Sequence, residues 1–317
     1  MRSLSNFIRH NDGPDSAAAI ARPARPDEVH EGLALILGND APAGPDQVLD
    51  FLQFAADRKI NLQQLWVLER ANRAQWAALP IVSPGHTALL FAPPVRPRGV
   101  DVGPVIEAVC DQLAGQDVHL VQALIDPADS DGRDLFGNHR FREMAELLYL
   151  HAQVARALPE VILPNGFWWR SYSDQTHPLF ERVIQESYQQ SLDCPALNGM
   201  RTIGDVVAGH RASGEFDPRF WFLLSEADRP CAVVMLSRVP RTDMAELVYL
   251  GLSPAARGRG IGDLMIRQAF HAVREMNLAR LTLAVDSKNT PALRLYYRHG
   301  MQRVGSKIAM MRDLRTM

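Results

Sequence analysis

The chain has 317 residues, about twice the roughly 100 to 200 residues of a typical domain, so we expect two globular units rather than one large core. Hydrophobic residues make up 47% and charged residues 22%, which excludes a disordered or fibrous protein. No apolar run approaches the roughly 20 residues of a membrane helix, and the first residues lack a secretory signal pattern. Three scattered cysteines are too few for a disulfide framework or a zinc site. We therefore expect a cytoplasmic protein that binds no metal and no membrane.

The charge is balanced overall but uneven along the chain. A net charge of −2 argues against nucleic acid as a partner. From Arg257 to the end, however, there are twelve basic and four acidic residues, an excess of about +8, so the remainder has about −10. This basic segment suits a small polyanionic ligand, but it also suits solvated helix faces. Charge alone leaves both interpretations open.

Patterns in the first half predict alternating strands and helices. A short strand in IARP precedes a helix that opens near Asp27, which can serve as its N-cap. Turn residues such as SPG separate the strand-like runs. The remaining predicted elements are a helix at 47–58, strands at 66–68, 76–81 and 87–92, a helix at 102–113, a strand at 118–125, a helix at 133–138 and a strand at 146–154.

The second half predicts the same order again. Its elements are a strand at 167–171, helices at 177–190 and 203–212, strands at 219–224, 232–239 and 245–252, a helix at 260–276, a strand at 280–285, a helix at 290–299 and a strand at 303–311. The repeated mixed order indicates two tandem α+β domains. We place their junction in the Pro-marked segment 159–165, which gives domains at 1–160 and 161–317.

The segment 246–270 is the most informative part of the sequence. An alternating apolar strand passes through a short loop and a glycine-rich turn into an amphipathic helix. The turn has a glycine at every second position, at Gly258, Gly260 and Gly262. Glycines let the backbone approach a ligand closely, and the free amides of a helix N-terminus bind anions. With Arg257 and Arg259 beside it, this turn is typical of a site for a diphosphate.

Other interpretations of this turn are weaker. A dinucleotide fingerprint places GxGxxG directly after the strand, whereas SPAAR intervenes here and the third glycine comes one position early. Asp286, after the next strand, could still mimic the ribose-binding acid of that motif. A Walker loop is excluded because GK[ST] is absent. A purely structural glycine turn stays open.

The spacing closely resembles the GNAT superfamily of acetyl-CoA-dependent acetyltransferases. The family signature Q/R-x-x-G-x-G/A is matched by residues 257–262. A second signature, N-x-x-A-x-x-L-Y followed by a glycine, is matched by Asn289, Ala292, Leu295, Tyr296 and Gly300. Met301 stands where Phe is usual, which is a conservative departure. The two signatures lie about 30 residues apart, and the resemblance covers roughly 167–317.

The resemblance implies a fold, a donor and a set of roles. Each domain should be a mixed, mostly antiparallel twisted sheet flanked by helices, and acetyl-CoA should be the acyl donor. The tyrosine that matches Tyr296 sits near the thioester sulfur as a candidate proton donor, with Tyr297 as the fallback. The implied cofactor-binding residues are Leu250, Gly251 and Leu252 along the pantetheine arm, Arg257, Gly258, Arg259, Gly260, Ile261, Gly262 and Asp263 at the diphosphate, and Asn289 and Ala292.

Acetyl transfer to an amine also needs a base. An amine with a pKa of about 10.4 is neutral in only about one molecule per thousand near pH 7. Glu246 is our first choice because it lies on the same strand as Leu250, four residues earlier, so alternation puts both on one face unless a bulge intervenes. In GNAT proteins a carboxylate on this strand commonly contacts the acceptor amine. A strand-edge glutamate paired with an arginine is the alternative.

The expected acceptor is the primary amine of a small molecule or a peptide N-terminus. In GNAT proteins its recognition usually falls on the first two helices and their loop, here 188–210. Tyr188, Asp193, Cys194 and His210 are the candidates, although packing explains a lone His or Cys equally well. Direct transfer needs no cysteine nucleophile. We expect a monomer or a weak homodimer.

The first half has lost the features of a donor site. Its counterpart of the glycine turn is 95–103, where Arg96 and Gly99 fit the signature. Asp101, however, replaces the second glycine and would repel a diphosphate, and Pro97 lacks an amide donor. Phe136, the counterpart of Tyr296, has no hydroxyl. We predict a degenerate first domain and a catalytic second one. The rival hypothesis is a non-catalytic acyl-CoA sensor or interaction protein.

Overall fold

The computed structural model describes residues 18–38, 41–94, 96–97 and 99–316. It divides into two compact units, one of Met1–Ile81 with Leu89–Asp117 and the other of Val82–Ala88 with Val118–Met317. No helix within the described ranges is long and apolar enough to cross a membrane.

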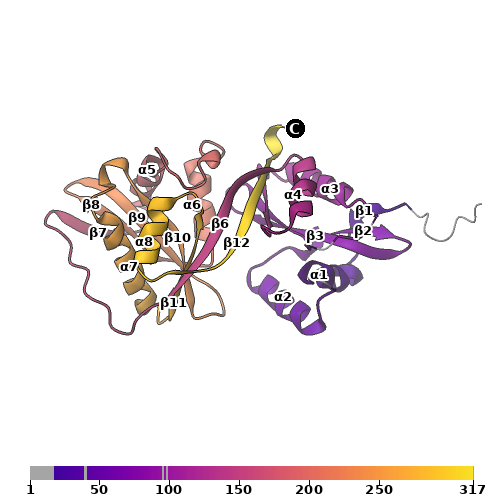
Figure 1. Ribbon diagram of the computed structural model, residues 1–317, viewed down its shortest axis with the longest axis horizontal. Helices are drawn as coiled ribbons and strands as arrows, with labels where there is room; N and C mark the ends of the chain where they lie inside the picture. Colours follow the sequence, from indigo (N-terminus) through magenta and orange to yellow (C-terminus); the bar gives the residue numbers. More distant parts are fainter. Residues whose placement is uncertain (1–17, 39–40, 95, 98, 317) are drawn as a thin grey trace, which may run out of the picture. The chain divides into compact units, whose positions relative to one another are not determined.

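The order of elements repeats, as predicted (Figure 1). The first half has β1 (Ile20–Pro23), α1 (Val29–Leu37), α2 (Pro45–Asp57), β2 (Trp66–Arg70), β3 (Arg73–Ser83), β4 (Thr87–Phe91), α3 (Gly103–Ala114), β5 (Leu120–Ile125), α4 (Ser130–Asn138) and β6 (Arg142–Gln153). The second half has β7 (Phe167–Ser171), α5 (His177–Ser187), α6 (Ile203–Ala212), β8 (Glu215–Glu226), β9 (Arg229–Arg238), β10 (Met244–Leu252), α7 (Ile261–Glu275), β11 (Arg280–Asp286), α8 (Thr290–Arg298) and β12 (Gln302–Asp313). The tandem α+β class is confirmed.

In the first unit, β2 pairs antiparallel with both β1 and β3, and residues of α1 and α2 share a core with these strands. The predicted N-cap of α1 is wrong. Asp27 lies inside a short 3₁₀ turn, Pro26–Glu28, and Glu28 occupies the cap position of α1. The Glu28 carboxylate accepts hydrogen bonds from Arg22 and from the backbone of Arg25, which stabilises this turn ahead of the helix.

In the second unit, the strand order is β5-β12-β6-β11-β10-β9-β8-β7. β10 and β11 run parallel, whereas the other pairings described for these strands are antiparallel. The sheet is therefore mixed and mostly antiparallel, as expected.

The last strands of the two halves are exchanged. β6, from the first half, pairs with β11 of the second half, and β12, from the second half, pairs with β5 of the first. β6 and β12 also pair with each other, as the two long neighbouring strands in Figure 1. For this reason no compact unit ends in the segment 159–165. The compact units therefore differ from the two copies of the sequence repeat, and the predicted bounds of these copies, 1–160 and 161–317, stay a prediction.

Helices cover both faces of this sheet between β8 and β11. α7 has buried residues four apart, at Ile261, Met265, Ala269 and Val273, which form one stripe against the sheet. α5 and α6 pack against the opposite face. The alternating residues of β9 show the division: Val234 lies in the α7-side core and Val233 in the α5-side core.

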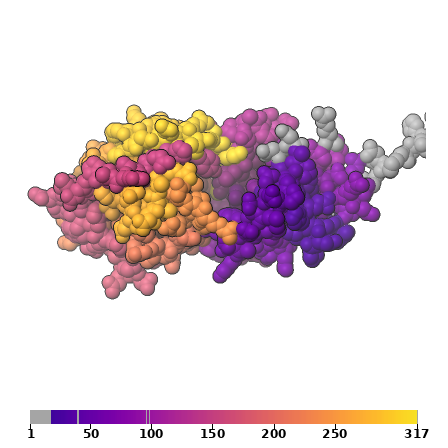
Figure 2. All heavy atoms as spheres, turned by 90° about the horizontal axis from the view of Figure 1, so that it is seen from below, coloured from indigo at the N-terminus to yellow at the C-terminus, as the bar shows by residue number. Residues whose placement is uncertain are grey.

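The segment that joins β6 to β7 lies over α7. His271 Nε2 and the Pro159 carbonyl oxygen are 2.8 Å apart, and Leu158 and Leu163 pack against the α7-side core. Figure 2 shows this segment as a magenta band across the yellow and orange atoms of the second unit.

Candidate active site

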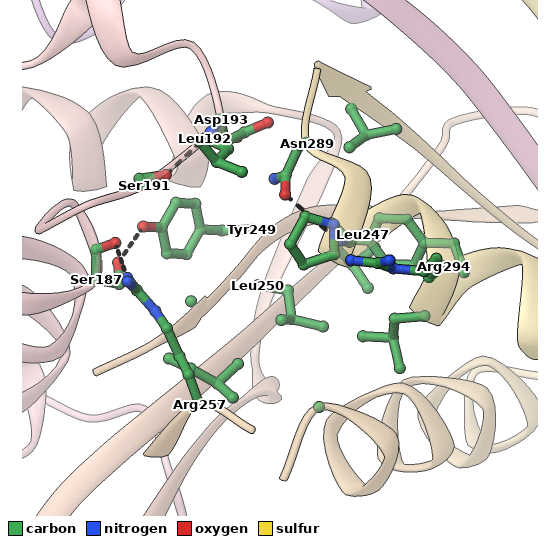
Figure 3. A pocket seen from close by; sticks show the side chains of 18 of the residues that line it. Ser187, Ser191, Leu192, Asp193, Leu247, Tyr249, Leu250, Arg257, Asn289 and Arg294 are labelled. Atoms are coloured by element: carbon green, nitrogen blue, oxygen red, sulfur yellow. Dashed lines mark hydrogen bonds between the residues drawn. The ribbon is translucent and has the colours of Figure 1, made fainter. Parts of the chain in front are cut away.

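A cleft opens where β10 and β11 separate. Among the described residues, the two strands pair only from Met244 and Arg280 to Glu246 and Thr282. Beyond this point lies a cavity of about 690 Å³ (Figure 3). Its walls come from β10, the end of β11, the start of α7, α8 and the segment after α5.

A bulge in β10 changes which residues share a face. Glu246 lies opposite Ser237 on β9, but Leu250 lies opposite Val234, only three residues away. An odd difference puts the two side chains on opposite faces. Leu250 packs with the α7-side core, whereas Val248, at the bulge, packs with the α5-side core. The expectation that Glu246 and Leu250 share a face is therefore wrong, and the bulge is the reason.

Two glycines of the turn adopt backbone angles that favour glycine. Gly258 has φ 72° and Gly260 has φ 77°, both left-handed. Gly260 is the N-cap of α7, so the first-turn amides of the helix face the cleft edge that Gly258, Gly260 and Gly262 line. At Gly262 an added Cβ would lie 3.1 Å from Leu295 Cδ2, so glycine lets α8 approach α7.

The arginines of the turn point in different directions. The Arg257 guanidinium donates to the carbonyl oxygens of Ser187 at 2.7 Å and Gln189 at 2.8 Å, at the end of α5 (Figure 3). Arg257 still lines the cleft. Arg259 pairs instead with Glu226 at 2.6 Å and is not among the lining residues. Its predicted charge at the diphosphate is therefore not seen in this structure.

Other residues supply charge that the sequence interpretation missed. Arg294 and Arg298 of α8 line the cleft, and Arg298 also pairs with Asp263 at 3.0 Å. The four-residue spacing puts both arginines on one side of α8, and this spacing within the second signature could have revealed them. Asp263 binds His299 as well, with Oδ1 2.9 Å from Nε2.

Of the two candidate tyrosines, Tyr296 lines the cleft. Its side chain is buried, whereas Tyr297 is 46% exposed. Burial raises the pKa of the Tyr296 phenol above its usual value of about 10, and the negative charge of Asp193 adds to the shift. Tyr296 therefore keeps its proton at neutral pH, as a proton donor must.

Asn289 joins the cleft to the start of α8. Its Oδ1 accepts a hydrogen bond from the Ala292 N–H at 3.4 Å, so it is the N-cap of the helix (Figure 3). The Asn289 side chain also lies near enough to the Asp193 carboxyl group to lower its pKa. Asp193 is exposed as a residue but lines the cleft, and burial of its carboxyl group raises its pKa, partly offset by the bond from the Asp286 N–H.

The other acceptor candidates separate into one cleft residue and two packing residues. Tyr188 lines the cleft. Cys194 does not, and burial and the nearby Asp193 and Asp286 raise the pKa of its thiol to about 12, which excludes a thiolate nucleophile at neutral pH. His210 packs on Tyr249, with ring centroids 5.1 Å apart, and burial lowers its pKa to about 4.

Tyr249 and Ser187 are cleft residues that the sequence interpretation missed. Their hydroxyl oxygens lie 2.6 Å apart (Figure 3). Gly251 makes this contact possible, since an added Cβ there would lie 2.6 Å from Tyr249 Cε1 and 2.8 Å from Ser187 Oγ. The other lining residues not predicted include Ser191, Leu192 and Pro291. No fixed motif position marks these residues. Ser187 ends α5, Ser191 and Leu192 lie in the loop after it, Tyr249 lies on β10, and Pro291 stands at a variable position of the second signature.

Most of the predicted cofactor residues therefore lie together. Those that line the cleft are Leu250, Gly251, Leu252, Arg257, Gly258, Gly260, Gly262, Asp263, Asn289 and Ala292. Arg259 and Ile261 do not, and the Ile261 side chain is buried in the core beneath α7. Glu246, the predicted base, is half-buried and is not among the lining residues, although the next residue, Leu247, is.

Comparisons with known proteins identify the family. The Acetyltransferase (GNAT) family model matches residues 185–301. Mycothiol acetyltransferase of Mycobacteroides abscessus is 30% identical over 219 residues, which are 67% of this chain and 69% of the relative. Mycothiol acetyltransferase of Nocardia farcinica is 26% identical over 284 residues, 86% of this chain and 89% of the relative.

Solved structures agree in fold. A GCN5-related N-acetyltransferase from Sphaerobacter thermophilus has a TM-score of 0.63 at 17% identity, covering 93% of this chain and 96% of its own. A tandem GNAT protein from the clavulanic acid biosynthesis pathway has a TM-score of 0.52 at 13% identity, covering 93% and 98%. The tandem arrangement also resembles mycothiol synthase, in line with the curated relatives. The chain belongs to the GNAT family of acetyltransferases.

Proposed function

We propose that the C-terminal copy, 161–317, transfers an acetyl group from acetyl-CoA directly to the primary amine of a small molecule or a peptide N-terminus. The observation that supports this most is the cleft itself. It brings together the left-handed glycines at the start of α7, the open edge of β10 and the protonated phenol of Tyr296. A diphosphate, a pantetheine arm and a thioester need these three features in this order along one cleft.

In this proposal the chain binds the donor mainly through its backbone. The first-turn amides of α7 bind the diphosphate, and Arg257, Arg294 and Arg298 add positive charge around the cleft. β10 pairs with β11 no further than Glu246 among the described residues, so its edge at Leu250–Leu252 offers N–H and C=O groups to the amides of the pantetheine arm.

The proposed chemistry uses one base and one acid. The neutral amine nitrogen attacks the thioester carbonyl carbon, and Glu246 takes the proton that the nitrogen loses. The C–S bond then breaks, and Tyr296 donates its proton to the leaving thiolate of CoA. Lowering the pKa of an acceptor amine from about 10.4 to near 7 takes about 4 kcal/mol, which desolvation supplies. A carboxylate favours the charged amine, so Glu246 acts as the proton acceptor and does not lower this pKa.

The first copy, 1–160, is proposed to be degenerate. The Asp101 carboxylate accepts a hydrogen bond from the Gly103 N–H at 2.9 Å, at the start of α3. In α3, the helix that corresponds to α7, an N-terminal amide is thus already bound to an acid. Val95 and Arg98, in the same loop, lie outside the described residues. Phe136 is buried in the position that corresponds to Tyr296.

The names of the relatives suggest the first acceptor to test. They make the amine substrate of a mycothiol acetyltransferase the first compound of the panel. The wider panel is spermidine, kanamycin, L-cysteine ethyl ester and a peptide with a free N-terminus.

The decisive experiment measures release of free CoA thiol from acetyl-CoA with each amine of this panel. Amine-dependent release supports the enzyme. Binding of acetyl-CoA without release under every condition supports the alternative, a non-catalytic acyl-CoA sensor or interaction protein. Calorimetric titration should find one acetyl-CoA site per chain, and two equal sites would contradict the degenerate first copy.

A further inference from the structure

The exchanged strand β6 brings side chains of the first half to the sheet face of Glu246. On β11, Thr282 lies opposite Glu246 of β10 and opposite His151 of β6. Residues that pair directly across a sheet point to the same face, so these three form a row. Tyr149 is two residues from His151 and therefore points to that face too.

The neighbours of Tyr149 leave room for its ring. It lies opposite Ala284 on β11 and opposite Gly305 on β12, so small residues flank it on both sides. Ala284 is itself a lining residue of the cleft. The adjacent residues Leu148 and Leu150 belong to the α7-side core, which confirms that Tyr149 points the other way. Its side chain is half-buried.

Tyr149 and Glu246 are close enough to interact electrostatically. Burial raises the pKa of the Tyr149 phenol, and the negative charge of Glu246 raises it further. The phenol therefore remains protonated at neutral pH and can donate a hydrogen bond. A hydrogen-bond donor and an aromatic ring beside a carboxylate suit an amine that has a carbon skeleton with polar oxygens.

We propose that the first half contributes Tyr149 to the acceptor site, where its ring packs against the carbon skeleton of the acceptor and its hydroxyl binds an acceptor oxygen next to Glu246. This inference rests on the proposed function and identifies the side of the cleft from which the amine binds. It gives the first half a direct part in substrate binding, through β6, although its own donor site is degenerate.

The test compares Tyr149→Ala and Tyr149→Phe with the unchanged full-length chain. We expect Tyr149→Ala to raise the KM for the fastest amine of the panel about tenfold or more, and Tyr149→Phe to raise it about threefold. The KM for acetyl-CoA should stay within twofold in both, because the glycine turn is untouched. Circular dichroism checks folding, and Tyr149→Phe keeps the comparison valid if the alanine variant does not fold.

Tyr172→Phe is the matched control. It also removes one phenol hydroxyl, but Tyr172 belongs to the α5-side core, its hydroxyl bonds His177 at 2.9 Å, and it is not among the lining residues. Its KM values should remain unchanged. An amine KM within twofold of the unchanged chain in both Tyr149 variants would overturn the inference, and so would equal rises for both substrates.

A binding measurement separates this inference from the proposed function. Calorimetry with the same amine in the presence of CoA gives the acceptor Kd without turnover, and Tyr149→Ala should weaken it about tenfold. Turnover that the Tyr149 variants leave unchanged contradicts the inference alone. A chain that binds amine without turnover contradicts the proposed chemistry, while the Kd comparison still decides the inference. A chain that neither turns over nor binds any amine contradicts both.

Discussion

Asp193 and Asp286 hold the loop after α5 to the end of β11 by two reciprocal hydrogen bonds. Asp193 Oδ1 accepts the Asp286 N–H at 3.2 Å, and Asp286 Oδ2 accepts the N–H of Cys194 at 3.1 Å. Asp286 is buried, and its Oδ1 also accepts the Lys288 N–H at 2.8 Å. This pair holds the wall of the cleft next to Tyr296. Asp286 therefore has a structural role in place of the ribose-binding role that a dinucleotide motif would have assigned to it.

The Asp193→Asn variant should gain stability relative to the unchanged chain as the pH rises. The pKa of Asp193 is raised in the folded chain, mainly by burial, above an unfolded value of about 3.9. The protonated form therefore stabilises the fold below the unfolded pKa, and this contribution is lost as the pH rises through the folded pKa. Asparagine keeps an acceptor oxygen and has no charge to bury.

Melting temperatures from pH 3.5 to 7.5 check this prediction. The difference between Asp193→Asn and the unchanged chain should move in favour of the variant across this range. The exposed Asp174→Asn serves as control, with no such trend. A difference for Asp193→Asn that does not vary with pH would contradict burial of this carboxyl group.

Tyr296→Phe should lower kcat by about 10 to 10³-fold, because it removes the proposed donor of the proton to the CoA thiolate. The KM for acetyl-CoA should change little. The raised pKa of Tyr296 also predicts that activity does not fall through ionisation of this group up to pH 10. Thiol-release kinetics measure both. Tyr297→Phe is the comparison variant, and a larger loss there than at Tyr296 would reverse the assignment.

Glu246→Gln should also lower kcat by about 10 to 10³-fold, because glutamine cannot accept the amine proton. Raising the pH should restore part of the rate, since a larger fraction of the acceptor is then neutral. Glu215→Gln, at the exposed start of β8, provides the control. Unchanged rates in Glu246→Gln would remove Glu246 from the mechanism and favour the alternative, a strand-edge glutamate paired with an arginine.

The repeated order of elements was predictable from the sequence because each strand and helix has its own hydrophobic period. The ends of β7 and α6 agree with the predicted residues 167–171 and 203–212. The exchange of β6 and β12 was not predictable, because the hydrophobic pattern of each strand is equally compatible with pairing to a strand of its own half or of the other half. Nothing in the sequence therefore indicated that Tyr149 lies near the candidate site.

The residues of the candidate site were also only partly predictable from the sequence. The glycine turn and Tyr296 were predictable because their motif implies backbone angles and a helix N-terminus. The bulge between Leu247 and Tyr249 was not, because one extra residue leaves no mark in an apolar strand. Arg259 was misplaced because its partner, Glu226, lies 33 residues away in sequence.

Gly260→Ala should weaken acetyl-CoA binding about tenfold or more. Gly260 has φ 77° and an added Cβ would meet nothing within 4 Å, so the effect comes from the left-handed backbone alone. A residue with a Cβ costs about 1 to 2 kcal/mol in this conformation, and any relaxation turns the first amides of α7 away from the diphosphate. Calorimetric titration with acetyl-CoA measures the change.

Gly166→Ala is a matched control within the same unit. Gly166 has φ 84° and equally open surroundings, but it precedes β7, outside the cleft lining. Both variants should lose similar stability in thermal unfolding, because both force a Cβ into the left-handed region. Only Gly260→Ala should also raise the Kd for acetyl-CoA. Equal affinities in the two variants would show that the start of α7 does not bind the donor diphosphate.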